Sequence, residues 1–190
     1  MSKGDSARQS YDAVRQEILL RMRLRDQMLV AYLVVVGAIL SVSIGHNDNK
    51  EILLSIPFLA LGSALIVSQH TVLAVYLGEF LSTELDECFK SSDVDEDIPR
   101  WDNSATFGRF RDKSNLYRLF AHTLMLLVPC IIALSKNIEH ALVYPFPFET
   151  LLWWFGFFCL LCTAIIIFTV WLERLNSYIK RRWRNNKKLG

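Results

Sequence analysis

Charged side chains are almost absent from four long stretches of this 190-residue chain, and this absence argues against a soluble fold. Hydrophobic residues make up 52% of the sequence and collect in those stretches. A helix needs about 20 apolar residues to cross a hydrocarbon core about 30 Å thick. Four buried helices in a soluble protein would need a polar covering that a chain of this length does not supply. The sequence therefore predicts an integral membrane protein.

The four apolar runs are residues 28–45, 52–78, 116–135 and 150–172. Only the third contains a charge, Arg118, near its start. The predicted fold is therefore all-α, a polytopic membrane protein with four transmembrane helices. The first run is not expected to be a signal peptide, because a long arginine-rich segment precedes it and no small-residue cleavage site follows it.

Lysine and arginine are scarce in the two short connections within the predicted hairpins. Of the 21 Lys and Arg residues, only Lys50 and Lys136 fall there. Because cytoplasmic segments carry the excess of positive charge, we expect both termini and the central segment to be cytoplasmic. In a bacterium the chain would lie in the inner membrane. The two external connections are too short to form a receptor or enzyme domain.

The predicted organisation has five parts, defined by hydrophobicity and charge. They are a cytoplasmic basic amphipathic helix (1–27), a transmembrane hairpin (28–78), a cytoplasmic acidic helix and linker (79–115), a second hairpin (116–172) and a cytoplasmic polybasic tail (173–190). The helical pattern of the second run continues beyond Gly78. We therefore expect that helix to project two or three turns into the cytoplasm.

Recognisable catalytic motifs are also missing. The chain has no glycine-rich phosphate loop, nucleophile elbow or kinase motif set, so no enzyme is expected. None of the four cysteines falls in a predicted external loop, and a structural disulfide is not expected. Cys159 and Cys162 have redox-motif spacing but apolar neighbours; with Gly156 and Thr163 they indicate a small-residue packing face. No cofactor or metal is expected.

Two histidines lie within the predicted spans, where ionisable residues are costly and often functional. His70 and His122 would both lie in the cytoplasmic third of the membrane on adjacent antiparallel helices. One interpretation is a proton- or ligand-sensitive gate. The alternative is a pair of neutral histidines bonded to nearby hydroxyls or reaching the interface. A zinc site lacks a third ligand.

The second run also carries a stripe of small and polar residues within about 120° of a helical wheel. Its members are Ser55, Gly62, Ser63, Gln69 and His70. In an oligomer this face would line a pore, with Leu59, Ile66 and Leu73 as hydrophobic constrictions. In a monomer it would be a close helix-packing face. The candidate pore-lining or gating residues are Ser63, Gln69, His70 and His122.

The cytoplasmic segments carry two candidate interaction sites of opposite charge. Three acids at the end of the second helix are candidates for binding a protein partner: Glu84, Asp86 and Glu87. They lack the spacing of a calcium loop, and the alternatives are solvation or pairing with basic segments. Four bases in the tail are candidates for binding anionic lipids: Lys180, Arg181, Arg182 and Arg184. Direct nucleic-acid binding is not expected.

The first half of the chain, residues 11–89, resembles SLATT-type transmembrane effectors in its layout. An arginine-rich helix runs into Arg25-Asp26-Gln27, a tight pair of spans follows, and a helical extension comes after them. Members of that family are small bacterial membrane proteins of anti-phage operons, with two spans where this chain has four. The resemblance implies oligomerisation and membrane disruption triggered by a cytoplasmic partner or ligand.

Two functions follow as hypotheses. The first is a regulated homo-oligomeric membrane effector, triggered from the cytoplasmic face. It would form a pore or ion channel or perturb the membrane, and the resemblance implies a role in antiviral defence. The second is a non-conducting membrane anchor or sensor that recruits a soluble cytoplasmic partner through its charged segments. A secondary transporter fits less well, because four spans and one weak internal repeat give little room for alternating access.

Overall fold

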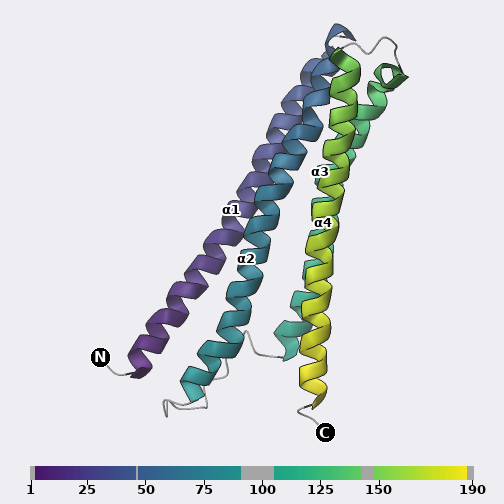
Figure 1. The fold of residues 1–190 in the computed structure, drawn as a ribbon. Helices are drawn as coiled ribbons and strands as arrows, with labels where there is room; N and C mark the ends of the chain where they lie inside the picture. Colours follow the sequence, from purple (N-terminus) through teal and green to yellow (C-terminus); the bar gives the residue numbers. More distant parts are fainter. Residues whose placement is uncertain (1–2, 46, 91–104, 143–147, 188–190) are drawn as a thin grey trace. The chain divides into compact units, whose positions relative to one another are not determined.

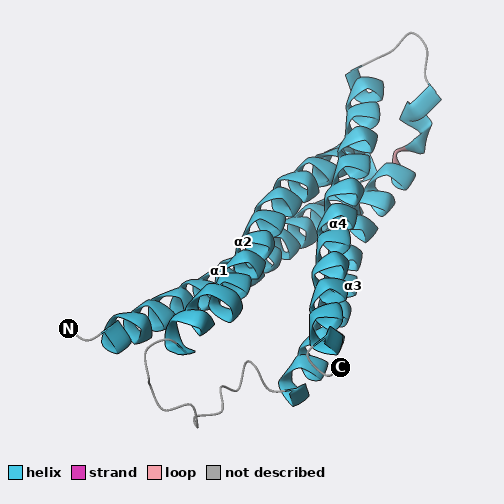
Figure 2. Ribbon diagram, turned by 60° about the horizontal axis from the view of Figure 1, so that its bottom comes forward, coloured by secondary structure: helices cyan, strands magenta, loops and turns pink. Residues whose placement is uncertain are grey.

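The computed structural model describes residues 3–45, 47–90, 105–142 and 148–187, and for some residues near the ends of these ranges it describes the backbone alone. The described residues contain no strand, and helix runs through almost all of them (Figure 2). The α-helices are α1 (Lys3–Gly45), α2 (Ile56–Lys90), α3 (Ala105–Lys136) and α4 (Phe148–Lys187), shown in Figure 1. The 3₁₀ helices are η1 (Asn47–Ser55) and η3 (Ile138–Leu142).

Each α-helix contains a segment long and apolar enough to cross a membrane. The segments are Arg8–Ser43, Lys50–Leu81, Tyr117–Lys136 and Phe148–Glu173. The prediction of an all-helical chain with four such helices is confirmed. Four candidate spans in one chain make it a multi-pass membrane protein.

The helices are longer than a bilayer requires. With 43 residues, α1 is about 65 Å long, roughly twice the thickness of the hydrocarbon core. The predicted basic helix and the first apolar run therefore form one unbroken helix. Helix α2 continues past Gly78 to Lys90, so the expected helical extension of the second run is confirmed.

The start of α2 differs from the expected start at residue 52, because Ile52 lies in η1 and the α-helix begins at Ile56. Pro57 is the second residue of α2. A first-turn N–H has no intrahelical acceptor, so proline costs no hydrogen bond there. The tight connection after α1 is thus a 3₁₀ segment that leads into a proline-initiated helix.

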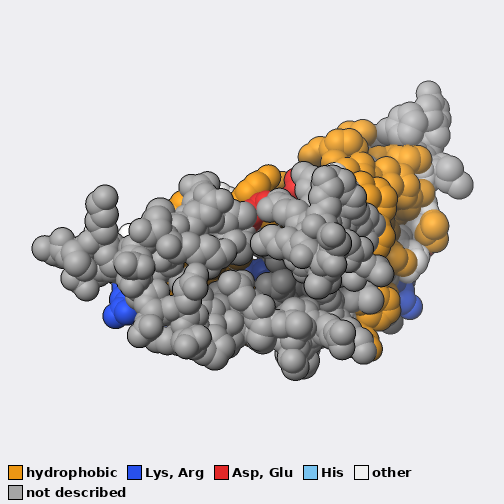
Figure 3. Space-filling model, turned by 90° about the horizontal axis from the view of Figure 1, so that it is seen from below, with side chains coloured by type: hydrophobic (Ala, Val, Ile, Leu, Met, Phe, Trp, Pro, Cys, Tyr) orange, Lys and Arg blue, Asp and Glu red, His pale blue; other side chains and the backbone are white. Residues whose placement is uncertain are grey.

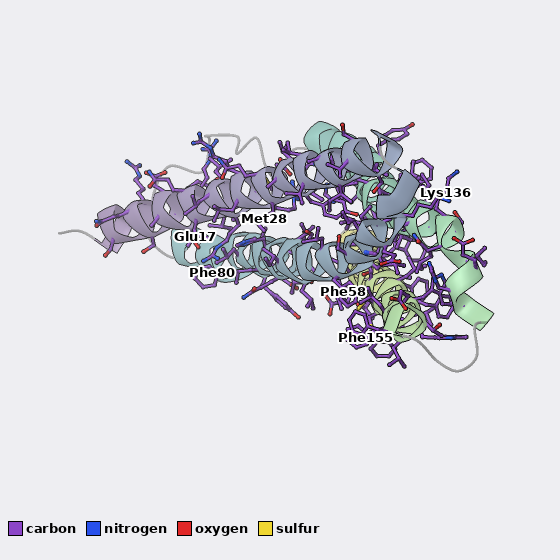
Figure 4. The ribbon with its side chains drawn as sticks, turned by 90° about the horizontal axis from the view of Figure 1, so that it is seen from above. Glu17, Met28, Phe58, Phe80, Lys136 and Phe155 are labelled. Atoms are coloured by element: carbon purple, nitrogen blue, oxygen red, sulfur yellow. The ribbon has the colours of Figure 1, made fainter. Side chains whose placement is uncertain are left out.

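The chain divides into two compact units. The first contains Met1–Gln27 and Gln69–Phe120, and the second contains Met28–Ser68 and Ala121–Gly190. Within the first unit, the part of α1 around Glu17 runs beside the part of α2 around Phe80 (Figure 4).

The second unit has a hydrophobic core to which all four helices contribute. Its buried members are Leu29, Tyr32 and Val36 of α1, Leu53 of η1, Ile56, Ala60, Ala64 and Val67 of α2, and Leu126, Cys130 and Ala133 of α3, with Leu160, Ile166 and Ile167 of α4 packed against them. Ala60 and Ala64 are separated by one helical turn, and small residues at that spacing let helices approach closely. Phe58 of α2 and Phe155 of α4 stack with ring centroids 5.2 Å apart (Figure 4).

Large apolar side chains also cover the outside of the helices. Val34, Phe148 and Ile165 each expose at least 60% of their surface. Figure 3 shows such side chains gathered on one flank of the molecule. Contiguous exposed apolar surface of this kind is typical of a protein that lipid surrounds.

Candidate functional site

Several polar side chains inside the second unit are hydrogen-bonded within the unit. The Tyr32 hydroxyl of α1 donates to the Leu126 carbonyl of α3 at 3.4 Å, and the Cys130 thiol donates to the same oxygen at 3.0 Å. The Thr163 hydroxyl donates to the Cys159 carbonyl at 2.8 Å. An unbonded hydroxyl in an apolar core costs several kcal/mol, so these bonds remove that penalty.

Asn137, just after α3, connects the two helical hairpins. It is fully buried. Its Nδ2 donates to the Lys50 carbonyl of η1 at 3.1 Å and to the Ala133 carbonyl of α3 at 2.9 Å. One carboxamide therefore ties the first hairpin to the second at the end of this unit formed by η1 and η3, which we call the loop end.

Two tryptophans of α4 strengthen the loop end. The Trp153 indole N–H donates to the Leu134 carbonyl at 3.0 Å, and that of Trp154 donates to the Ala141 carbonyl of η3 at 3.2 Å. Trp153 also stacks on Phe157 with ring centroids 5.8 Å apart. Indole groups often sit where an apolar ring and a polar N–H both find partners. Together these contacts fix the register of α4 against α3.

Sequence analysis missed Asn137. A lone carboxamide directly after an apolar run is a signal of a polar cap, but its acceptor is a distant carbonyl that has no sequence signature. Its Oδ1, and the hydroxyl of the fully buried Thr150, have no hydrogen-bond partner among the described residues.

Three members of the predicted small-residue face of α4 are buried, and the fourth, Cys162, is half-buried. Gly156, Cys159 and Thr163 lie one turn apart, with Cys159 and Thr163 no more than 2% exposed. A Cβ added at Gly156 would lie 3.4 Å from Leu134 Cδ2 and 3.5 Å from Pro57 Cγ. Glycine there allows α4 to contact both α3 and α2. Cys159 and Cys162 are free thiols.

The predicted stripe begins with Ser55 in η1, and its members in α2 differ in exposure. Gly62 is exposed, and a Cβ added to it would meet no heavy atom within 4 Å. Gln69 is exposed and Ser63 half-buried. Ser55 is satisfied locally, since its hydroxyl donates to the Ile52 carbonyl at 2.6 Å. Within one copy, the packing face of α2 is formed by its buried alanines and valine, and Gly62 has no role in it.

The two histidines belong to different units, which are described separately, so their proximity stays a prediction. His70 of α2 is half-buried, and its Nδ1 has no hydrogen-bond partner among the described residues. His122 of α3 is half-buried and takes part in an interaction. Of these two histidines, His70 is the one with a buried ring nitrogen that lacks a hydrogen-bond partner among the described residues.

The charged candidate sites lie on described helical backbone, but their side chains fall outside the described residues. Glu84, Asp86 and Glu87 are in the last turns of α2. The four tail bases Lys180, Arg181, Arg182 and Arg184 are in the last turns of α4. The acidic linker, residues 91–104, is outside the described residues altogether. Partner and lipid binding by these segments stay predictions.

Within the described part of the chain, no group of three or more histidine, cysteine, aspartate or glutamate side chains is arranged to hold a metal ion. The polar groups that are described supply hydrogen bonds between helices and one outward polar face on α2. In comparisons with known proteins, no family model, curated protein or solved structure matches the chain.

Proposed function

We propose that the chain is a regulated homo-oligomeric membrane effector that forms a pore or perturbs the bilayer when a cytoplasmic signal reaches it. The observation that carries this proposal is the outward polar face of α2, where Gly62 and Gln69 are exposed on a helix of the membrane-spanning bundle. The described core clusters of the second unit consist of hydrophobic side chains, and the buried charge Arg25 lies on α1 in the first unit. We expect a polar pathway to form between copies.

The long helices supply a means of regulation. Helices α1, α2 and α4 extend well beyond the length that a span requires, with 43, 35 and 40 residues. We place these extensions in the cytoplasm on the positive-inside rule. A partner bound at Glu84, Asp86 and Glu87 would act directly on α2, which carries Ser63, Gln69 and His70. The layout resemblance to SLATT-type effectors supports the same function.

Expression of the full chain in bacterial cells tests this function. Induction is expected to depolarise the membrane, reported by a voltage-sensitive dye, in cells that contain the cytoplasmic trigger. A matched chain with Gln69→Leu and His70→Leu should insert equally, as judged by membrane fractionation, and depolarise less. Equal depolarisation by the two chains would remove the α2 face from the mechanism.

A non-conducting anchor is the second candidate. It is favoured by the hydrophobic core and by the hydrogen-bonded loop end. These features suit a rigid membrane domain that anchors a cytoplasmic assembly. In this function the acids of α2 recruit a soluble protein, and the membrane stays sealed when that protein binds.

A further inference from the structure

Six residues at alternating steps of three and four share one face of α2, here called the α2 seam: Leu59, Gly62, Ile66, Gln69, Leu73 and Tyr76. Leu59, Ile66 and Tyr76 expose 38%, 36% and 60% of their surface. Gly62 and Gln69 are exposed and Leu73 is half-buried. Alternation of three and four is the spacing that keeps one helix face against a neighbouring helix along a left-handed crossing.

Gln69 shows what kind of neighbour fits the α2 seam. No hydrogen bond to its carboxamide occurs in the described structure, although it lies within the uncharged part of the Lys50–Leu81 span. A carboxamide that faces hydrocarbon without a partner costs free energy. The group has both donors and an acceptor, so an identical carboxamide complements it.

Membrane insertion brings identical residues to the same depth. All copies of one chain insert with the same orientation, so symmetric copies that meet along α2 do so in parallel. Gln69 of one copy then lies level with Gln69 of the next. Gly62, two turns away on the α2 seam, leaves open space that lets the two backbones approach.

We propose that a second copy of this chain docks on the α2 seam, with the Gln69 carboxamides of neighbouring copies hydrogen-bonded to each other. This inference rests on the proposed function, because it names the surface through which the effector assembles. Lipid alone is the other occupant of the α2 seam, and it leaves the carboxamide unpaired.

Two open glycines provide a matched test. Gly37 of α1, like Gly62, is exposed and would place a Cβ in open space, so leucine fits at either position in a single copy. The full-length protein is reconstituted in lipid nanodiscs and liposomes, and self-association is measured by energy transfer between labelled copies on lipid dilution. Native mass spectrometry gives the subunit number.

Gly62→Leu and Gln69→Leu should each weaken association by about threefold to tenfold, the range for interhelical polar contacts in membranes. Gly37→Leu should leave it unchanged, and Gln69→Asn should associate more strongly than Gln69→Leu. A monomeric wild type, or equal association of wild type and both variants of the α2 seam, would overturn the inference. Equal losses from Gly37→Leu and Gly62→Leu would also overturn it.

Docking at the α2 seam and the proposed function can be disproved separately. Oligomers that depend on the α2 seam in liposomes that stay sealed with every trigger would support the α2 seam and overturn the effector function. Liposomes that leak equally with wild type and with both variants of the α2 seam would support the function and overturn the α2 seam.

Discussion

The side-chain amide of Asn137 donates a hydrogen bond of 3.1 Å to the main-chain carbonyl of Lys50, 87 residues earlier in the chain. The same amide donates to Ala133, so both of its hydrogens are used in a fully buried position. This relationship joins the two hairpins at the loop end.

Asn137→Leu should destabilise the protein by about 1–3 kcal/mol, because the Lys50 carbonyl loses its donor and the side chain no longer caps α3. Thermal unfolding of the purified protein in detergent measures the effect. Ser135→Ala is the control, since the exposed Ser135 hydroxyl bonds only to Ile132 of its own helix. A shift no larger than that of the control would show that the bond has no role in holding the hairpins together.

The effect of a substitution at Gly156 on stability should depend on the size of the new side chain. Gly156→Ala is expected to be neutral or to stabilise by up to about 1 kcal/mol, because its Cβ makes ordinary contacts and alanine favours helix. Gly156→Ile should destabilise by about 1–3 kcal/mol, because the added atoms overlap with Leu134 and Pro57. The same unfolding measurement compares the two variants. Equal stability of the alanine and isoleucine variants would mean that α4 does not approach α2 and α3 as closely as described.

His70→Leu should change ion leakage without changing membrane insertion. The Nδ1 atom of His70 is buried without a hydrogen-bond partner among the described residues. We expect this atom to bond to another group when the gate changes state. Leakage of a fluorescent reporter from liposomes is the measurement. His140→Leu, at the loop end in η3, is the control histidine. If leakage stays the same as in wild type, His70 is not a gating residue.

Charge reversal of the α2 acids tests whether they form the docking surface for a soluble partner, which both proposed functions use. Glu84, Asp86 and Glu87 changed together to lysine should abolish capture of a soluble partner from the cytosol by the membrane-embedded protein, because the partner's basic surface would be repelled. Capture is measured by pull-down and quantitative mass spectrometry. Reversal of Asp12, Glu139 and Glu173, three acids that are exposed on other helices, provides a charge-matched comparison. Capture that survives in the triple variant would place the docking surface elsewhere.

The sequence predicted the four helices because an uncharged run of spanning length has almost no alternative in a membrane, where every backbone group must bond internally. It also predicted that α2 would pass Gly78 and that the face with Gly156 and Cys159 would pack. These are local properties of each helix. The 3₁₀ segment before α2 was not predicted, because Ile52–Ser55 has the same apolar composition as the helix that follows.

Contacts between the two hairpins could not be predicted from the sequence. The bond from Asn137 to Lys50 depends on the register of two segments far apart in the chain, and its acceptor is a main-chain carbonyl that every residue has. The outward direction of Gly62 depends on which side of α2 the other helices cover. The pairing of His70 with His122 stays a prediction, as do the roles of the charged cytoplasmic segments.

Ion flux through the purified chain in liposomes, with subunit number measured on the same sample, tests the central claim most directly. The account predicts flux through an oligomer, either at a permissive pH or after addition of cytosolic extract, and less flux from Gln69→Leu. Liposomes that contain inserted protein and remain sealed across the pH range and with cytosolic extract would contradict the effector function.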